Sequence, residues 1–337
     1  MPGKLQSRLI NPPFGDPGLH VELGAARRAL LFDMGSLAPL AVRQLLRVEA
    51  VFVSHMHMDH FAGFDWALRL WLGRPKRVRL FGPIGLIDAV EHRLLSYSWN
   101  LAHGYEAALV LEVAELDEAG HGRCAWFGLR DGFRRRREQT AQFPGGLLID
   151  EPDLEVRCAT LDHGIPCLAF ALEERRKISV RKSRLLELGL ETGPWLGELK
   201  RLVLAGAAAT TILEVQGRDG PRRMALGVLS RELLTIGRGA SLAYVTDCGW
   251  SEENRRRIRA LARDVDSLFI EAAFLDEDRR RAGERRHLTA LQAGTVAREA
   301  GARRVVPFHF SPRYEDREAL LRGEVETAFR GDATAAP

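Results

Sequence analysis

Residues 50–63 read AVFVSHMHMDHFAG, an apolar run that passes directly into three histidines and one aspartate within six positions. Imidazole and carboxylate groups are both good ligands for zinc and similar divalent ions. In an extended turn, residues two apart point the same way, so His55 and His57 can share one ion. Asp59 and His60 then face a neighbouring position. The stretch therefore predicts a metal site, with ligands for more than one ion, at the end of an apolar strand.

Other apolar runs also end on residue types that a metal site needs. Four of them lead to His163, Asp247, Glu271 and His309. In open α/β sheets, functional side chains collect at the ends of strands, where rigid elements hold them in place. We expect His163 and His309 to be the third imidazoles, one for each ion. We expect Asp247 to bridge the ions, because its negative charge offsets the repulsion between two cations.

The composition is that of an ordinary globular protein, since 46% of the 337 residues are hydrophobic and 28% are charged. Short β-type runs alternate with longer amphipathic stretches and no linker divides the chain, which favours one α/β domain across residues 1–337. The longest uncharged, mostly apolar run, residues 202–213, is too short to cross a bilayer, so we expect no membrane contact. No apolar leader follows Met1, and the four cysteines form no C-x-x-C pair. These features favour a reduced, cytoplasmic protein without a disulfide framework.

Basic residues cluster locally, although the formal net charge is only +4. One cluster lies in the stretch of more than eighty residues between His163 and the next strand end, which is longer than the core needs. Within it, residues 171–200 are the candidate arm inserted into the fold. A row of basic side chains of this kind can contact the phosphate backbone of a nucleic acid. The alternative interpretation of the cluster is an ordinary solvated surface.

Four residues of this arm are the candidate contacts to a substrate RNA. They are Lys177, Arg181, Lys182 and Arg184, which lie within eight positions of one another. At helical spacing, Lys177, Arg181 and Arg184 would fall on one face of a helix.

Residues 54–63 resemble the signature of the metallo-β-lactamase superfamily. Later segments resemble its ribonuclease Z family, the endonucleases that trim the 3′ ends of precursor tRNA. The supporting segments follow the family's order, at residues 162–166, 193–200, 243–247, 287–294 and 309–314. The resemblance implies an αβ/βα sandwich, two zinc ions at the edge of the sheets (with Mn²⁺ as the alternative divalent ion) and a homodimer. It also implies one ion on His55, His57 and His163, another on Asp59, His60 and His309, and Asp247 as the bridge.

A two-metal site of this kind predicts hydrolysis of a phosphodiester. A water shared by two ions loses its proton near neutral pH, and the resulting hydroxide attacks phosphorus in line. Asp59 lies beside that water, and the resemblance assigns it the proton. The leaving 3′-oxygen needs a proton donor, for which His287 is the candidate, oriented by Glu271 in a His–carboxylate pair. The alternative for Glu271 is a surface acid near residues 279–281, and Arg313 is of the right type to hold a phosphate.

Three functions are open on this basis. The first is a zinc-dependent phosphodiesterase that acts as an endoribonuclease on precursor tRNA. The second keeps the same core and metals but acts on a small ester, a cyclic phosphodiester or a phosphonate. The third is metal-stabilised nucleic-acid binding without catalysis, which would need neither the full ligand set nor His287. The salt dependence of RNA binding separates the first two, because an arm that contacts several phosphates gives a steep slope.

Overall fold

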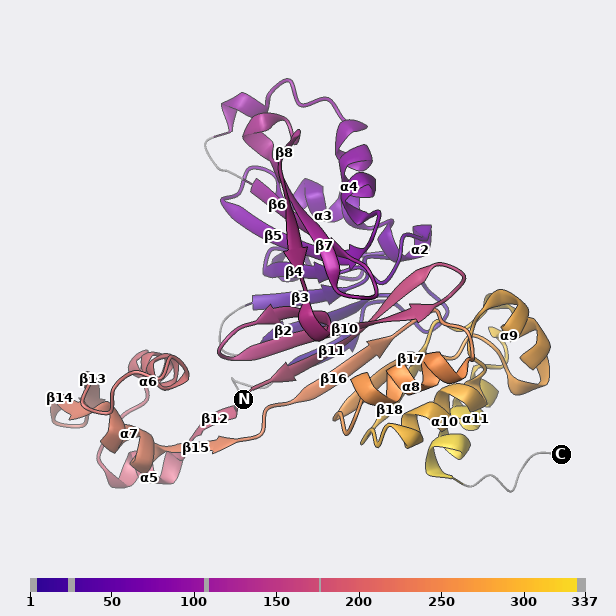
Figure 1. Ribbon diagram of the computed structural model, residues 1–337. Helices are drawn as coiled ribbons and strands as arrows, with labels where there is room; N and C mark the ends of the chain where they lie inside the picture. Colours follow the sequence, from indigo (N-terminus) through magenta and orange to yellow (C-terminus); the bar gives the residue numbers. More distant parts are fainter. Residues whose placement is uncertain (1–4, 24–27, 106–108, 176, 332–337) are drawn as a thin grey trace.

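Two β-sheets lie face to face in the computed structural model, and helices cover the outer side of each sheet (Figure 1). The structure describes residues 5–23, 28–105, 109–175 and 177–331. The arrangement is the predicted αβ/βα sandwich, so the fold class expected from the sequence is confirmed.

The first sheet has eight strands in chain order. They are β1 (Gln6–Leu9), β2 (Leu19–Leu23), β3 (Arg28–Phe32), β4 (Val48–Phe52), β5 (Lys76–Pro83), β6 (Leu109–Leu116), β7 (His121–Gly128) and β8 (Arg135–Gln142). The helices of this half are α1 (Val42–Leu45), α2 (Met58–Phe61), α3 (Phe64–Trp71) and α4 (Leu86–Leu95).

The second sheet has six strands, and its order departs from that of the chain. They are β9 (Leu147–Asp150), β10 (Leu154–Asp162), β11 (Pro166–Glu174), β16 (Ser241–Val245), β17 (Ser267–Glu271) and β18 (Val305–Phe308). In space they follow the order β18-β17-β16-β11-β10-β9. The helices of this half are α8 (Glu252–Leu261), α9 (Arg279–Arg285), α10 (Ala290–Glu299) and α11 (Glu318–Arg330).

Successive side chains of a strand point to opposite faces of the sheet, so one apolar strand can contribute to two layers of the core. In β3 and β4, Leu31 and Val51 pack with the helices, whereas Phe32 and Phe52 pack between the sheets. The rings of Phe32 and Phe52 stack with centroids 4.8 Å apart, and Phe170 of β11 approaches them at 5.7 and 5.5 Å. Because successive side chains of a strand point to opposite faces, a strand buried on both faces is apolar throughout.

The strands that carry the candidate ligands end at a common edge. β16, β17 and β18 are parallel, and β10 runs in the same direction because both it and β16 are antiparallel to β11. The first sheet reaches the same place, because the backbone N–H of Leu168 donates to the carbonyl of Ser54 at 2.8 Å. The fold therefore gathers the residues that follow β4, β10, β16, β17 and β18.

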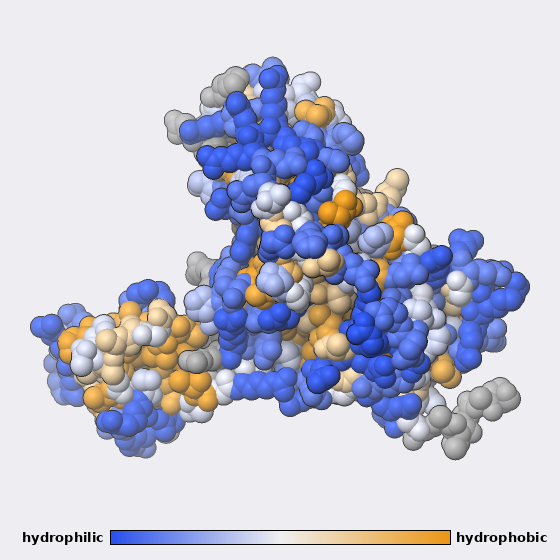
Figure 2. Space-filling view, in the orientation of Figure 1, coloured by the Kyte–Doolittle hydropathy of each residue, from blue (hydrophilic) through white to orange (hydrophobic). Residues whose placement is uncertain are grey.

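The chain between β11 and β16 leaves the sandwich and folds into an arm (Figure 1). Its elements are β12 (Lys177–Val180), α5 (Lys182–Glu187), α6 (Trp195–Leu204), β13 (Ile212–Gly217), β14 (Gly220–Ala225), α7 (Leu226–Leu233) and β15 (Leu234–Gly237). β12 pairs with β15 as a stem, and β13 pairs with β14 as a hairpin. Ten buried apolar residues, among them Trp195 and Leu229, form a core of its own. Figure 2 shows apolar side chains on its surface as well, where Leu186 and Ile212 are exposed.

The arm differs from the expected one in its limits and in its helix. Residues 171–174 complete β11, and the excursion continues to β15, well beyond residue 200. The expected helical face through Lys177, Arg181 and Arg184 is wrong, because the backbone of Lys177 lies in β12 and the helix begins only at Lys182. The pairing of β12 with β15 holds Lys177 in an extended strand, and β15 is distant in sequence. The side chain of Lys177 lies outside what the structure describes.

Within the described ranges, no helix is both long enough and apolar enough to cross a membrane. All four cysteines are free thiols, and three of them, Cys158, Cys167 and Cys248, are buried.

Candidate metal centre and active site

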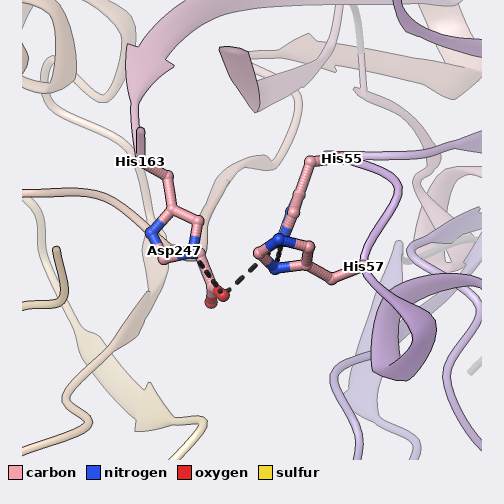
Figure 3. Close-up of side chains that lie close together, drawn as sticks. All are labelled: His55, His57, His163 and Asp247. Atoms are coloured by element: carbon pink, nitrogen blue, oxygen red, sulfur yellow. Dashed lines mark hydrogen bonds and ion pairs between the residues drawn. The ribbon is translucent and has the colours of Figure 1, made fainter. Parts of the chain in front are cut away.

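Four side chains from three strand ends meet in one cluster (Figure 3). His55 and His57 follow β4, His163 follows β10 and Asp247 follows β16. One ligand atom of each residue lies within 4.8 Å of the others. Nε2 of His55 is 2.9 Å from Nδ1 of His57, and Oδ2 of Asp247 is 3.6 Å from His55 Nε2 and 3.5 Å from His163 Nε2. The rings converge on the carboxylate, as the sequence analysis expected.

A second cluster shares that carboxylate. Asp59, His60 and His309 also bring ligand atoms within 4.8 Å of one another. Asp247 reaches this group as well, with Oδ2 at 3.5 Å from His60 Nε2 and Oδ1 at 2.8 Å from His309 Nδ1. Asp247 therefore lies between the two clusters and close to both.

The charge states in the first cluster suit metal binding. Burial lowers the pKa of His55 to about 2 and also lowers the pKa of His57. Both imidazoles are therefore neutral at pH 7 and keep a lone pair for an ion. Burial alone would raise the pKa of Asp247, but His309 and His60 hold it well below its ordinary value. His55, His57 and Asp247 thus combine two neutral nitrogen donors with an ionised carboxylate.

The second cluster differs in its charge states. Burial alone would lower the pKa of His60 and of His309, but Asp33 and Asp247 raise the pKa of His60 to about 10. Asp247 also raises the pKa of His309, so both rings must lose a proton to bind an ion.

The orientation of His60 depends on Asp33, a residue that the sequence analysis missed. Oδ2 of Asp33 lies 2.9 Å from Nδ1 of His60 and accepts the hydroxyl proton of Tyr244 at 2.9 Å. Its Oδ1 accepts the backbone N–H of Ser54 at 2.7 Å. With Nδ1 held in this way, Nε2 of His60 turns toward the cluster, where it is buried without a hydrogen-bond partner. A carboxylate behind a metal-ligating imidazole commonly fixes its tautomer and ring orientation.

A signal for Asp33 was present in the sequence. Asp33 directly follows the apolar end of β3, as the other acidic and histidine residues follow their strands. It is fully buried and takes a left-handed backbone conformation, with φ of 58°.

Two features of the site fit a divalent cation. Nε2 of His60 is buried without a hydrogen bond, and the donor set mixes imidazole nitrogens with carboxylate oxygens.

Glu271 and His287 form a buried pair beside these clusters. Nδ1 of His287 lies 2.8 Å from Oε2 of Glu271, whose Oε1 accepts the backbone N–H of Cys248 at 2.7 Å. Glu271 is fully buried, which excludes the alternative of a surface acid. Burial alone would lower the pKa of His287, but the carboxylate of Glu271 raises it above the ordinary value. The ring centroid of His287 is 4.9 Å from that of His163 and 5.7 Å from that of His309, so this imidazole lies beside both clusters.

A cavity of about 470 Å³ opens over these groups. The candidate ligands and proton donor that line it are His57, Asp59, His163, Asp247, His287 and His309. Phe274, Arg281, Arg285 and Arg313 also line it. Arg313 therefore lies at the cavity, as expected, and it donates to Oδ2 of Asp278 at 3.0 Å.

Known proteins match most of the sequence. Residues 198–310 match the family model described as Beta-lactamase superfamily domain. A protein of Deinococcus radiodurans named Ribonuclease Z is 34% identical over 318 residues, which cover 93% of this chain and 92% of the relative. This chain belongs to the ribonuclease Z family. The resemblance identified from the sequence is thereby confirmed, and the family makes the chain a metal-dependent hydrolase.

Solved structures agree with the fold of this ribonuclease Z family member. The metallo-beta-lactamase fold protein YhfI from Bacillus subtilis aligns with a TM-score of 0.55 at 14% identity, covering 97% of this chain and 93% of YhfI. The short form of human tRNase Z aligns with a TM-score of 0.50 at 19% identity and 93% coverage of each chain. At these identities the similarity shows the shared fold.

The candidate arm residues of this ribonuclease Z family member lie far from the cavity. β11 runs from the cavity edge at Pro166 to the arm at Glu174, and its nine residues span about 30 Å at roughly 3.3 Å each. Arg184 pairs with Glu187 and Glu232, and Arg181 donates to the backbone carbonyl of Arg231. Lys182 is exposed. The structure therefore brings the metal candidates, His287, Glu271 and Arg313 together, and leaves the arm residues apart from them.

Proposed function

We propose that this chain is an endoribonuclease that cleaves precursor tRNA at its 3′ end. One observation supports this most. Seven candidate metal ligands gather beside the Glu271–His287 pair, and five of them line one cavity together with His287, in a chain of the ribonuclease Z family. A protein that only bound nucleic acid would need neither the ligand set nor a proton donor.

We propose that the chain binds two zinc ions. His55, His57 and His163 would hold one, Asp59, His60 and His309 the other, and Asp247 would be shared. When bound, such ions polarise a phosphoryl oxygen and make a coordinated water acidic near neutral pH. Asp33 is a positioning residue in this proposal, because it holds Nδ1 of His60 and leaves Nε2 for the ion.

Asp59 and His287 would move the protons. Burial alone would raise the pKa of Asp59, but the hydrogen bond with His309 lowers it to about 2, so its carboxylate is ionised and can accept a hydrogen bond from the attacking water. The raised pKa of His287 favours the protonated ring, which would donate to the leaving 3′-oxygen. Glu271 would act through His287 by orienting the ring and stabilising its charge.

The arm and the quaternary structure are further parts of the proposal. Lys177, Arg181, Lys182 and Arg184 would contact the RNA at a distance from the cleavage site, and Arg313 would hold a phosphate at the cavity. The homodimer and the cytoplasmic location expected from the sequence stay predictions. Light scattering on the purified protein tests the first, and fractionation of the source cells tests the second.

An activity screen tests the proposed function. Zinc-loaded protein is incubated with precursor tRNA, bis(p-nitrophenyl) phosphate and small cyclic nucleotides, and the RNA products are mapped at nucleotide resolution. We expect cleavage of precursor tRNA at its 3′ end and slower hydrolysis of the nitrophenyl ester. Turnover of a cyclic nucleotide without cleavage of RNA would instead support the small-substrate alternative.

A further inference from the structure

Helix α9 and the residue after it carry five arginines, and three of these are neutralised within the protein. Arg279 pairs with Asp276 at 2.7 Å, and Arg280 pairs with Glu284 at 2.6 Å. Arg286 pairs with Asp162 at 2.8 Å. Each of the three thus has an acidic partner close by.

The other two arginines, Arg281 and Arg285, differ from these three in their ion pairing and in their position at the cavity. Among the residues described by the structure, neither has an ion pair or a hydrogen bond with an acidic side chain. Both line the cavity that holds the metal candidates and His287. Among the described residues, the two arginines of this segment that line the cavity therefore make no direct contact with an acidic side chain, and Arg281 interacts with Asp278 only at longer range, whereas the three outside the cavity are paired.

Arg281 and Arg285 are four positions apart in α9 and so lie on the same face of the helix. Two like charges at this spacing are slightly destabilising, and an anion between them reverses the effect. A guanidinium offers a planar fork of donors that matches the oxygens of a phosphate. The backbone N–H of His287 donates to the carbonyl of Ala282 at 2.9 Å, which fixes the proton-donor residue against the same helix.

We propose that Arg281 and Arg285 bind phosphates of the substrate strand that neighbour the scissile phosphate, an inference that rests on the proposed function. The metal candidates that line the same cavity would serve the scissile group itself. The arginines recognise a strand with consecutive phosphates, and they add nothing to the binding of a small phosphodiester that has only one. They are substrate-binding residues of the cavity, independent of the arm.

The test compares two double variants of the same helix. Arg281→Gln/Arg285→Gln removes the two unpaired arginines, and Arg279→Gln/Arg280→Gln removes the same charge from paired positions outside the cavity. For precursor tRNA, we expect the first variant to raise KM about tenfold or more with little change in kcat. The salt slope of RNA binding should fall by about 0.7 for each single-strand phosphate that the variant no longer neutralises. Hydrolysis of bis(p-nitrophenyl) phosphate should be unchanged, because that substrate has no neighbouring phosphate.

Each other outcome overturns the inference in a distinguishable way. If the two double variants behave alike on RNA, unpaired arginines at the cavity have no special role, and the proposed function still stands. If the first variant loses activity equally on both substrates, with an unchanged thermal melting curve, the arginines act on the scissile group instead. If the wild-type protein cleaves no RNA, the proposed function fails and this inference fails with it.

Discussion

The arm and the strand-end cavity both contain arginines, but these arginines differ in whether an acidic side chain pairs with them. In the arm, four arginines each lie beside an acidic residue of the arm itself, and these are Arg184, Arg201, Arg222 and Arg231. At the cavity, Arg281 and Arg285 make no ion pair within the described ranges and line the same space as the candidate metal ligands. Positive charge in the sequence is therefore a poor guide to a binding site, because pairing in the folded chain decides how much of it remains available.

The two regions also differ in how firmly they hold their polar groups. His55, His60 and Asp247 are almost fully buried at the ends of strands that belong to the main cores. The arm rests on a core of ten buried apolar residues at the far end of β11 and β16. Rigid strand ends can hold reacting groups within the narrow tolerance that catalysis needs, whereas the role proposed for the arm is binding. Substitutions in the two regions should therefore affect different steps.

The largest effect is expected from Asp247→Ala. It removes the carboxylate that lies close to both clusters, so both ions should be lost or strongly weakened and activity should fall to that of metal-free protein. Substitution of a residue that only supports a metal ligand typically lowers metal affinity or activity about 10–100-fold. Loss of the shared ligand itself should therefore cost more. Metal content and hydrolysis of bis(p-nitrophenyl) phosphate measure it. The control is Asp219→Ala, which removes an exposed carboxylate of the arm and should change neither. Full metal content in Asp247→Ala would show that the shared ligand is misassigned.

His287→Ala should keep the metals and lose turnover. Removal of a general acid typically costs about 10²–10⁴-fold on an unactivated substrate such as RNA. The loss should shrink with bis(p-nitrophenyl) phosphate, because a nitrophenolate leaving group needs little protonation. His121→Ala removes an exposed imidazole at the start of strand β7, and this matched control should behave as wild type. Equal losses on the two substrates would contradict the role of proton donor.

Asp33→Asn should weaken metal binding without abolishing it. The amide keeps the shape of the carboxylate but loses its charge, so Nδ1 of His60 is held less firmly. The expected cost is about 10–100-fold in metal affinity, measured by zinc competition with a chelator. Tyr244→Phe removes one hydrogen bond to the same carboxylate and should have a smaller effect in the same direction. Unchanged affinity in Asp33→Asn would assign Asp33 a role in folding alone.

The smallest effect on chemistry is expected from the arm. Replacing Lys177, Arg181, Lys182 and Arg184 together by Gln should leave hydrolysis of bis(p-nitrophenyl) phosphate unchanged, because the arm starts about 30 Å from the cavity along the nine residues of β11. Binding of precursor tRNA should weaken, and its salt slope should fall by about 0.7–0.9 for each phosphate that the arm no longer neutralises. Normal cleavage of precursor tRNA by this variant would mark the arm surface as ordinary solvated charge.

Local spacing in the sequence was enough to identify most of the candidate metal centre. His55, His57, Asp59 and His60 lie on one turn, so their proximity follows from the chain itself. His163, Asp247 and His309 were found because each follows an apolar run, and strands of one sheet that run in one direction end at one edge. The same rule reaches Asp33, which follows β3 and was overlooked because it is not a candidate ligand in the motif.

Only the tertiary structure decided which charges are available and how the arm is built. Arg280 and Arg281 are neighbours in the sequence, yet one is paired with Glu284 and the other faces the cavity, because successive helical residues point in different directions. Lys177 lies in a strand rather than a helix because β15, more than fifty residues later, pairs with it. The sequence by itself determined the ligand motif and the strand ends, which depend on local order. Ion pairing and strand pairing depend on partners that only folding brings near.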